Sequence, residues 1–248
     1  METKRQRKFG LIGKDIDYSF SRAYFAKKFE QQNIKNCQYV NFDCPDEDTV
    51  RETIARQDLA GLNVTIPYKE VAFAAVDELS EQARAIGAVN TVVFDDNGKT
   101  IGHNTDAYGF EKSLFEHWKG RTDKALILGT GGASKAVDFV LRQHHIYPQW
   151  VSRNPQEGVI TYPDLTDAII RQHLLIINCT PLGTFPNTSQ APDLPYAALT
   201  EEHFLFDLIY NPAETRFLSL GIKQGAKTAN GAQMLVHQAE ASWALWNA

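Results

Sequence analysis

An apolar strand that runs straight into a glycine-rich turn and then a helix constrains the fold of this chain more than any other stretch. Residues 125–134 read Ala-Leu-Ile-Leu-Gly-Thr-Gly-Gly-Ala-Ser, and residues 135–143 continue with a helical pattern. Glycines allow a positive φ angle or the close approach of a phosphate, and the free N–H groups of a helix N-terminus attract such an anion. The predicted cofactor-binding residues of this turn are Gly129, Gly131, Gly132 and Ala133.

The turn departs from the dinucleotide fingerprint at one position. Ser134 stands where the G-x-G-x-x-G pattern has its third glycine. Glycine turns also occur for purely structural reasons. From this stretch alone, a pyrophosphate site and a structural turn are both open.

Strands and helices alternate on both sides of the turn. The predicted strands are 8–12, 37–42, 61–66, 125–128, 149–152, 174–178 and 204–207. Such alternation is typical of α/β proteins with parallel sheets, and 248 residues with 43% hydrophobic content can fill two modest cores. We therefore predict a two-domain α/β protein, with an N-terminal α/β domain and a Rossmann-like, doubly wound dinucleotide domain.

Three local details refine this prediction. Residues 88–94 and 100–103 form a predicted hairpin, and Ser21 is the predicted N-cap of a helix over 22–32. Only about seven residues separate Ser152 from the next strand-like segment, whereas a parallel crossover usually takes a dozen or more. We expect a crossover helix to be missing there.

Composition excludes several classes of function. A net charge of −5 argues against a nucleic-acid surface, and no apolar run approaches the ~20 residues of a membrane helix. The cysteines are three in number and lack C-x-x-C spacing, so neither a disulfide framework nor a zinc site is indicated. We expect a soluble cytoplasmic protein without a metal, whose partner is a small molecule; the oligomeric state is not readable.

Polar side chains gather at the predicted strand ends. Ser19 and Ser21 precede a helix and can bind a small carboxylate, or simply cap the helix. Lys69 follows a buried strand, where open α/β sheets bind ligands, although an exposed lysine is the simpler interpretation. Asp106 is either an N-cap or a carboxylate directed into a cleft. Taken one at a time, the structural interpretations are favoured.

Taken together, these segments resemble the shikimate dehydrogenase family along nearly the whole chain. The matching segments are Gly10-Leu-Ile-Gly13, Ser19-Phe-Ser21, Asn63-Val-Thr-Ile-Pro-Tyr-Lys69, Gly87-Ala-Val-Asn-Thr91, Asn104-Thr-Asp106, the glycine turn, Asn178-Cys-Thr-Pro-Leu-Gly183, Phe206-Asp-Leu-Ile-Tyr-Asn-Pro212 with Glu214-Thr215, and Asn230-Gly-Ala-Gln-Met-Leu-Val-His-Gln238. The Asn63–Lys69 and Asn104–Asp106 elements, spaced this way before a dinucleotide turn, are the most specific.

The resemblance implies reversible reduction of 3-dehydroshikimate to shikimate by NADPH, on the pathway to chorismate and the aromatic amino acids. It implies that Lys69 and Asp106 form the catalytic pair beside the reacting oxygen. Hydride delivery to a carbonyl builds negative charge on oxygen, which an ammonium stabilises and protonates while a carboxylate orients it. The implied substrate-binding residues are Ser19, Ser21, Thr65, Asn90, Thr105, Tyr210 and Gln238.

The resemblance also implies a discontinuous arrangement of domains. Residues 1–104 with 230–248 form the expected substrate-binding domain, and 105–229 form the expected NADP-binding domain, because Gln238 has to return to the site that contains Ser19 and Lys69. The active site is then expected between the two domains.

Cofactor choice depends on the end of the second strand of the dinucleotide domain. Residues 151–154 read Val-Ser-Arg-Asn, with no carboxylate for the ribose hydroxyls of NAD before Glu157. Arg153 can pair with a 2′-phosphate, so NADP is favoured. The family usually has Asn-Arg-Thr and a second basic residue here, so the preference for NADP over NAD is expected to be reduced.

A second departure lies near the N-terminus. The family often has His-Ser-x-Ser-Pro, whereas Tyr18 and Arg22 flank the two serines here. This leaves open a quinate/shikimate or aminoshikimate dehydrogenase of broader specificity. The alternative from another class is a dinucleotide-binding module without turnover, in which Lys69 and Asp106 have no catalytic role.

Overall fold

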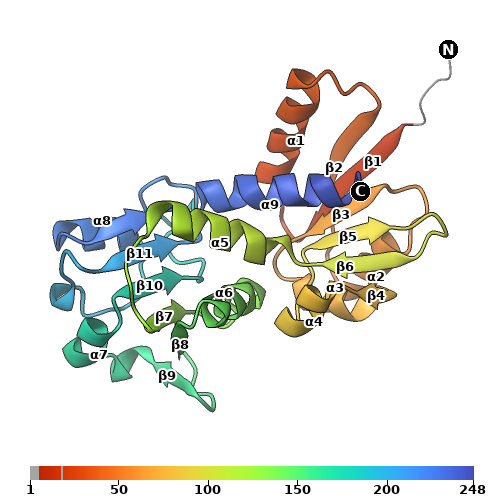
Figure 1. Cartoon of the computed structure of the whole chain (residues 1–248). Helices are drawn as coiled ribbons and strands as arrows, with labels where there is room; N and C mark the ends of the chain where they lie inside the picture. The colour runs from red at the N-terminus through yellow and green to blue at the C-terminus, as the bar shows by residue number, and fades with distance from the viewer. Residues whose placement is uncertain (1–5, 18) are drawn as a thin grey trace. The chain divides into compact units, whose positions relative to one another are not determined.

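The computed structural model describes residues 6–17 and 19–248, so that Tyr18 lies outside the described residues. The chain divides into two compact units. The first comprises the chain up to Thr105 together with Ala239–Ala248, and the second comprises Asp106–Gln238. Each contains a six-stranded sheet among its described residues, with helices packed against it (Figure 1).

The first unit is a mixed sheet. Its elements are β1 (Arg7–Gly13), α1 (Phe20–Gln31), β2 (Cys37–Asp43), α2 (Glu47–Ile54), β3 (Gly61–Val64), α3 (Lys69–Ala75), β4 (Glu78–Leu79), α4 (Glu81–Ile86), β5 (Thr91–Phe94) and β6 (Thr100–His103). The strand order is β2-β1-β3-β5-β6-β4. The three strands β2, β1 and β3 are parallel, and β5 and β6 add antiparallel, as the predicted hairpin requires.

An aromatic core joins the end of the chain to the first sheet. The ring of Phe9 lies 4.8 Å from that of Trp246, and Phe25 stacks on Tyr39 at 4.6 Å. The indole N–H of Trp246 donates to the carbonyl of Val92 at 3.0 Å. Buried aromatic pairs of this kind contribute roughly 1 kcal/mol each beyond the area they remove from water. The last two turns of α9 (Ala232–Leu245) are therefore firmly attached to the first unit.

The second unit is an all-parallel sheet among the described strands. Its further elements are α5 (Thr105–His117), β7 (Lys124–Leu128), α6 (Gly132–Gln143), β8 (Tyr147–Ser152), β9 (Val159–Thr161), α7 (Asp167–Gln172), β10 (Leu175–Asn178), β11 (Phe204–Asp207), α8 (Arg216–Lys223) and β12 (Lys227–Ala229), with short 3₁₀ turns at Tyr162–Asp164 and Tyr196–Ala198. The order β12-β11-β10-β7-β8-β9 is that of a Rossmann-type doubly wound sheet. The central strands β7, β10 and β11 are buried, as their unbroken apolar runs require.

The connection between β8 and β9 lacks a helix, as predicted. The two strands pair in parallel, with Ser152 opposite Thr161, and residues 153–158 contain no helical turn. Gly158 adopts φ +72° and its carbonyl accepts from the side-chain amide of Gln149 at 3.0 Å. A tight turn, in which Gly158 has a left-handed backbone conformation, therefore replaces the usual crossover helix.

Candidate functional site

Most of the polar residues predicted to bind the substrate lie at one edge of the first sheet. In register, Leu11 of β1 lies opposite Asn63 of β3, which lies opposite Thr91 of β5. Because β5 runs antiparallel to β3, it begins at the edge where β1 and β3 end, and β6 ends there too. The predicted residues that follow β1, β3 and β6, or precede β5, at this edge are Ser19, Ser21, Thr65, Lys69, Asn90 and Thr105.

The serine pair sits at the start of α1, but the predicted N-cap at Ser21 is wrong. The helix begins at Phe20, and Ser19 is its N-cap, in extended backbone, with Oγ accepting from Arg22 N at 3.4 Å. Phe20 and Tyr24, one turn apart, stack at 5.5 Å and support the additional helical residues. Ser21 therefore lies buried within the first turn.

The two serine hydroxyls contact the neighbouring strand β2. Ser19 Oγ donates to Asn41 Oδ1 at 3.1 Å, and Ser21 hydrogen-bonds with the hydroxyl of Tyr39. Both serines follow β1 and hydrogen-bond to residues of β2, and both belong to the N-terminus of α1, a location that favours an anion.

Lys69 is the first residue of α3, and the backbone on both sides of it is fixed. The N–H of Tyr68 donates to the carbonyl of Thr65 at 2.9 Å, which forms a turn directly after β3. The buried hydroxyl of Tyr68 donates to the carbonyl of Cys44 at 2.7 Å, and the N–H of Val89 donates to the carbonyl of Lys69 at 3.0 Å. Lys69 itself is half-buried rather than fully exposed.

Asn90 and Thr105 form a reciprocal pair at the same edge. The N–H of Thr105 donates to Asn90 Oδ1 at 2.6 Å, and Asn90 Nδ2 donates to Thr105 Oγ1 at 3.0 Å. The side chains are 2% and 3% exposed. Their mutual hydrogen bonds satisfy groups that would otherwise cost about 1 to 3 kcal/mol each when buried.

Three further predicted residues belong to the second unit. Asp106 is buried in the first turn of α5; since that helix begins at Thr105, the alternative that Asp106 is its N-cap is wrong. Tyr210 is half-buried after β11, and Gln238 is buried on α9, with Nε2 donating to the carbonyl of Leu235 at 3.1 Å. The meeting of these three residues with Lys69 and the serines stays a prediction.

The glycine turn lies between β7 and α6. Gly129 adopts φ +102°, and its N–H donates to the carbonyl of Val151 on β8 at 2.8 Å. Gly131 is the N-cap of α6 at φ −82°, and a Cβ built there would meet no atom within 4 Å. Gly129 is therefore required by backbone conformation, whereas Gly131 leaves space beside the helix N-terminus. Such space at amides without a side-chain cap fits a pyrophosphate.

Arg153 follows β8 at the same edge of the second sheet. Leu128 pairs with Val151, so the end of β7 and the end of β8 lie side by side. The N–H of Asn154 donates to the hydroxyl of Ser152 at 3.2 Å, which shapes the turn that presents Arg153. The guanidinium therefore follows the strand next to the glycine turn, where a Rossmann-type fold places the adenosine ribose.

A buried carboxylate that the sequence analysis left without a role organises this edge. Asp207, at the end of β11, accepts from Asn178 Nδ2 at 3.0 Å and from the N–H of Ile209 at 3.0 Å through Oδ1, and from Thr215 Oγ1 at 2.6 Å through Oδ2. Asn178 Oδ1 in turn accepts from the hydroxyl of Thr180 at 2.6 Å, next to Gly129. An acidic residue ending a buried strand was the signal that could have revealed it.

Burial decides the protonation behaviour of Asp207. The loss of hydration raises the pKa of its carboxyl to about 6, although the hydrogen bonds from Thr215, Ile209 and Asn178 oppose that rise.

Among the described residues no group of three or more His, Cys, Asp and Glu side chains is arranged to hold a metal ion. No described helix is long and apolar enough to cross a membrane.

Comparison with known proteins places this architecture in a family. Residues 11–92 match the family model for the shikimate dehydrogenase substrate binding domain. The shikimate dehydrogenase (NADP(+)) of Methanococcus maripaludis is 38% identical over 263 aligned positions, covering 99% of this chain and 92% of that protein. The chain belongs to the shikimate dehydrogenase family.

Solved structures agree with this membership in the shikimate dehydrogenase family. Shikimate 5-dehydrogenase from Thermus thermophilus in complex with NADP(H) and shikimate is 33% identical, with a TM-score of 0.84, covering 97% of this chain and 93% of that one. Quinate dehydrogenase from Corynebacterium glutamicum in complex with NAD is 28% identical, with a TM-score of 0.85, covering 98% of this chain and 94% of that one. The two-domain α/β prediction is thereby confirmed.

Proposed function

We propose that this protein catalyses the reversible, NADPH-dependent reduction of 3-dehydroshikimate to shikimate in the biosynthesis of chorismate and the aromatic amino acids. The observation that carries the proposal is the shared edge of the first sheet, where Ser19, Lys69, Asn90 and Thr105 follow or precede neighbouring strands. Relatives named for this activity align over nearly the full chain.

The first unit then acts as the substrate-binding domain and the second as the NADP-binding domain. Ser19 and Ser21 bind the substrate carboxylate at the N-terminus of α1, where the helix dipole and the hydroxyl donors both favour an anion. The side chains that hydrogen-bond to the ring hydroxyls are Thr65, Asn90, Thr105, Tyr210 and Gln238. Buried partners of this kind reject analogues because an unmatched group loses its hydrogen bond.

Lys69 and Asp106 form the proposed catalytic pair. NADPH supplies a hydride to the carbonyl carbon when it is bound. The ammonium of Lys69 stabilises the negative charge that develops on the carbonyl oxygen and donates a proton to it, and the carboxylate of Asp106 orients the lysine and the new hydroxyl. In the oxidation direction Lys69 accepts the proton back.

The glycine turn and Arg153 fit NADP(H). The space beside Gly131, at the start of a twelve-residue helix, admits the pyrophosphate to backbone N–H groups. Arg153 pairs with the 2′-phosphate through its planar, permanently charged fork. Because no second basic side chain follows Arg153 before Gly158, discrimination against NAD is expected to be modest.

A quinate/shikimate dehydrogenase is the second candidate. The similarity to an NAD-bound quinate dehydrogenase favours it. Quinate differs from shikimate by an added hydroxyl and a saturated ring, so the two activities need nearly the same polar partners. A binding module without turnover would require Lys69 and Asp106 to have no catalytic role.

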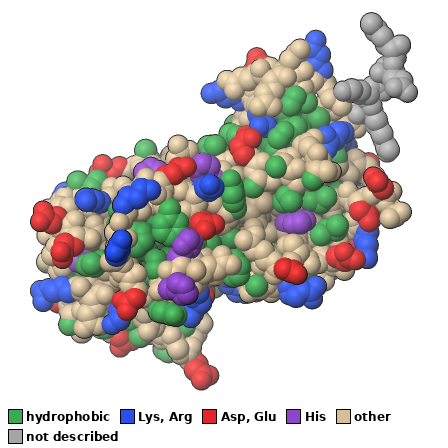
Figure 2. Space-filling view, in the orientation of Figure 1, with side chains coloured by type: hydrophobic (Ala, Val, Ile, Leu, Met, Phe, Trp, Pro, Cys, Tyr) green, Lys and Arg blue, Asp and Glu red, His purple; other side chains and the backbone are tan. Residues whose placement is uncertain are grey.

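The physical setting supports small-molecule partners rather than nucleic acid. The net charge is −5, and acidic and basic side chains are interspersed on the face shown in Figure 2. Cys37, Cys44 and Cys179 are free thiols, in keeping with a reducing cytoplasm.

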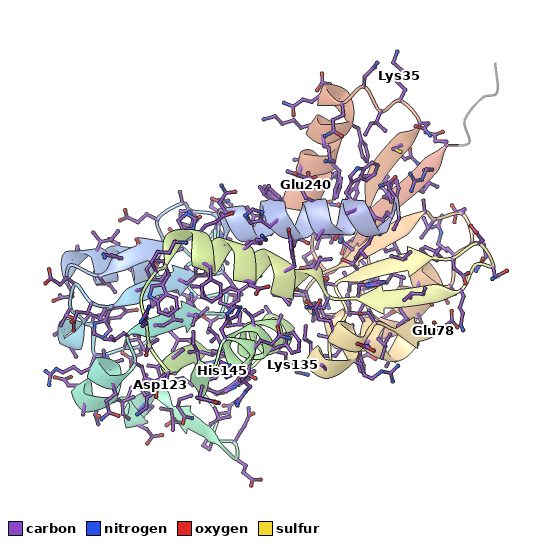
Figure 3. All side chains as sticks on the ribbon, in the orientation of Figure 1. Lys35, Glu78, Asp123, Lys135, His145 and Glu240 are labelled. Atoms are coloured by element: carbon purple, nitrogen blue, oxygen red, sulfur yellow. The ribbon has the colours of Figure 1, made fainter. Side chains whose placement is uncertain are left out.

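Substitution of Lys69 tests the proposal. Lys69→Ala is expected to leave shikimate binding within roughly tenfold while kcat falls on the order of 10³ or more, because the proton donor is lost but most binding groups stay. Lys35→Ala, which removes an exposed lysine of the same unit, is the matched control and is expected to behave like wild type (Figure 3). Rates with shikimate and quinate, each with NADP and NAD, separate the candidate functions. Normal turnover by Lys69→Ala would show that the mechanism is wrong.

A further inference from the structure

A cluster of three buried hydroxyls in the first unit includes that of Thr105, one of the proposed substrate-binding residues. Thr91 Oγ1 lies 3.1 Å from Thr105 Oγ1 and 2.9 Å from Ser242 Oγ, and the latter two oxygens are 3.1 Å apart. Thr91 and Ser242 are fully buried, and Thr105 is nearly so. Three hydroxyls at these distances orient one another, because each can donate only one proton.

The side chain of Asn63 holds this triangle of hydroxyls, formed by Thr91, Thr105 and Ser242, in place. Asn63 Nδ2 donates to Ser242 Oγ at 2.9 Å. The other end of the amide is set by Tyr39, whose hydroxyl donates to Asn63 Oδ1 at 2.8 Å. The amide group is thus held with its N–H groups toward Ser242.

Ser242 reaches this cluster from a helix far along the chain. It lies on α9, which is anchored before and after it within the first unit. Lys28 Nζ of α1 contacts Oε2 of Glu240 at 2.7 Å, and Trp246 donates to the carbonyl of Val92. Glu240 is labelled on α9 in Figure 3. These contacts do not involve the hydroxyl of Ser242. Removal of that hydroxyl is therefore expected to leave α9 in place.

Thr105 and Thr91 of this triangle also contact the side-chain amide of Asn90. The hydroxyls of Thr91 and Thr105 each lie 3.2 Å from Asn90 Oδ1, and the N–H of Thr105 donates to the same oxygen at 2.6 Å. The Thr105 hydroxyl also accepts from Asn90 Nδ2 at 3.0 Å, so its position helps to orient both ends of the Asn90 amide. Ser242 contacts Thr105 and Thr91 directly, and both of these hydroxyls lie within hydrogen-bond distance of Asn90 Oδ1.

We propose that Ser242 is a positioning residue of the active site, whose hydroxyl fixes Thr105 and Asn90 in the orientation that binds the substrate ring hydroxyls. The inference rests on the proposed function, since it assigns these two residues to the substrate. In this role Ser242 acts through Thr105 and Asn90. Its effect is on the pre-organisation of the site, which raises affinity by reducing the cost of ordering on binding.

Kinetics of Ser242→Ala test this role. The KM for shikimate is expected to rise about five- to tenfold, with kcat within about twofold and the KM for NADP unchanged, because one orienting hydrogen bond is lost. Ser242→Cys keeps the shape of the side chain, but a thiol bonds weakly, so its KM is expected to lie between those of wild type and Ser242→Ala. The matched control is Ser113→Ala, which removes a buried hydroxyl that has no hydrogen-bond partner in the described part of the chain. Its KM values are expected to equal those of wild type.

The outcomes separate this inference from the proposed function. Wild-type protein that neither turns over nor binds shikimate overturns both. Turnover by wild type, with an unchanged KM for shikimate in Ser242→Ala and a lowered melting temperature, overturns only the positioning role and leaves Ser242 a structural residue. An equal rise in the KM values for shikimate and NADP overturns it as well. If Ser242→Ala fails to fold, a wild-type KM in Ser242→Cys overturns it and a raised KM supports it.

Discussion

Replacement of Asp207 by asparagine is expected to change how the stability of the second unit depends on pH. Most carboxyl groups with a lowered pKa stabilise the folded state more as pH rises, whereas Asp207 is expected to stabilise it less. Asp207 is fully buried, and burial raises its pKa from 3.8 to about 6. The folded protein therefore holds the proton more tightly than the unfolded chain does. Stability contributed by this group is full well below pH 3.8, where both states are protonated, and is lost as pH rises from about 3.8 to about 6.

The magnitude follows from the size of the pKa shift. The rise in pKa from 3.8 to about 6 makes ionised Asp207 cost about 3 kcal/mol relative to the protonated form, because each tenfold change in proton affinity corresponds to about 1.36 kcal/mol. Asparagine keeps the shape and cannot ionise, although its amide faces the hydroxyl of Thr215, which donates to Asp207 Oδ2 in the wild type. The free energy of unfolding of wild type minus that of Asp207→Asn is thus expected to fall by about 2.5 kcal/mol between pH 4 and pH 7, because the unfolded carboxyl is already more than half ionised at pH 4.

Amide hydrogen exchange of β10 and β11 provides the assay. Wild type and Asp207→Asn are compared at each pH from 4 to 7, so that the pH dependence of the chemical exchange rate cancels. Asp77→Asn in the first unit, followed by exchange of β5 and β6, is the control. Hydrogen bonds from the N–H and hydroxyl of Thr100 lower the pKa of Asp77, so its stabilising effect is lost only as pH falls below about 4, and its difference from wild type is expected to stay flat from pH 4 to 7. A flat difference for Asp207 across this range would refute the reasoning.

Two further predictions concern the dinucleotide site. Arg153→Gln is expected to raise the KM for NADP by about tenfold or more while leaving the KM for NAD within about twofold, because only NADP carries the 2′-phosphate; equal effects on both cofactors, measured by steady-state kinetics, would contradict that assignment. Gly131→Ala is expected to preserve thermal stability, since its Cβ meets no atom within 4 Å, yet to weaken NADP binding measured by calorimetry. Gly129→Ala, at φ +102°, is expected to lose stability instead. Unchanged NADP binding by Gly131→Ala would show that the pyrophosphate does not bind at this turn.

The sequence predicts the buried central strands of the second unit directly. Continuous apolar runs at β7, β10 and β11 identify buried parallel strands, because strands covered on both faces need no polar alternation. The short β4, β12 and α7 were not predicted, since each has two to six residues and depends on its neighbours for pairing or packing. The start of α1 was placed too late because both serines are plausible N-caps in sequence, and the structure has the hydroxyl of Ser19 accept from Arg22 N.

The residue types and spacings of the site were available from sequence because chemistry fixes them: a lysine and an aspartate for proton transfer, serines for a carboxylate and glycines for a phosphate. By itself, the sequence determined the family, the α/β class and the missing helix after β8. The tertiary structure alone determined which polar groups support that site. Asp207 meets Asn178, and Ser242 meets Thr105, across 29 and 137 positions. Hydrogen bonds act over about 3 Å in space, so only folding brings such pairs within reach.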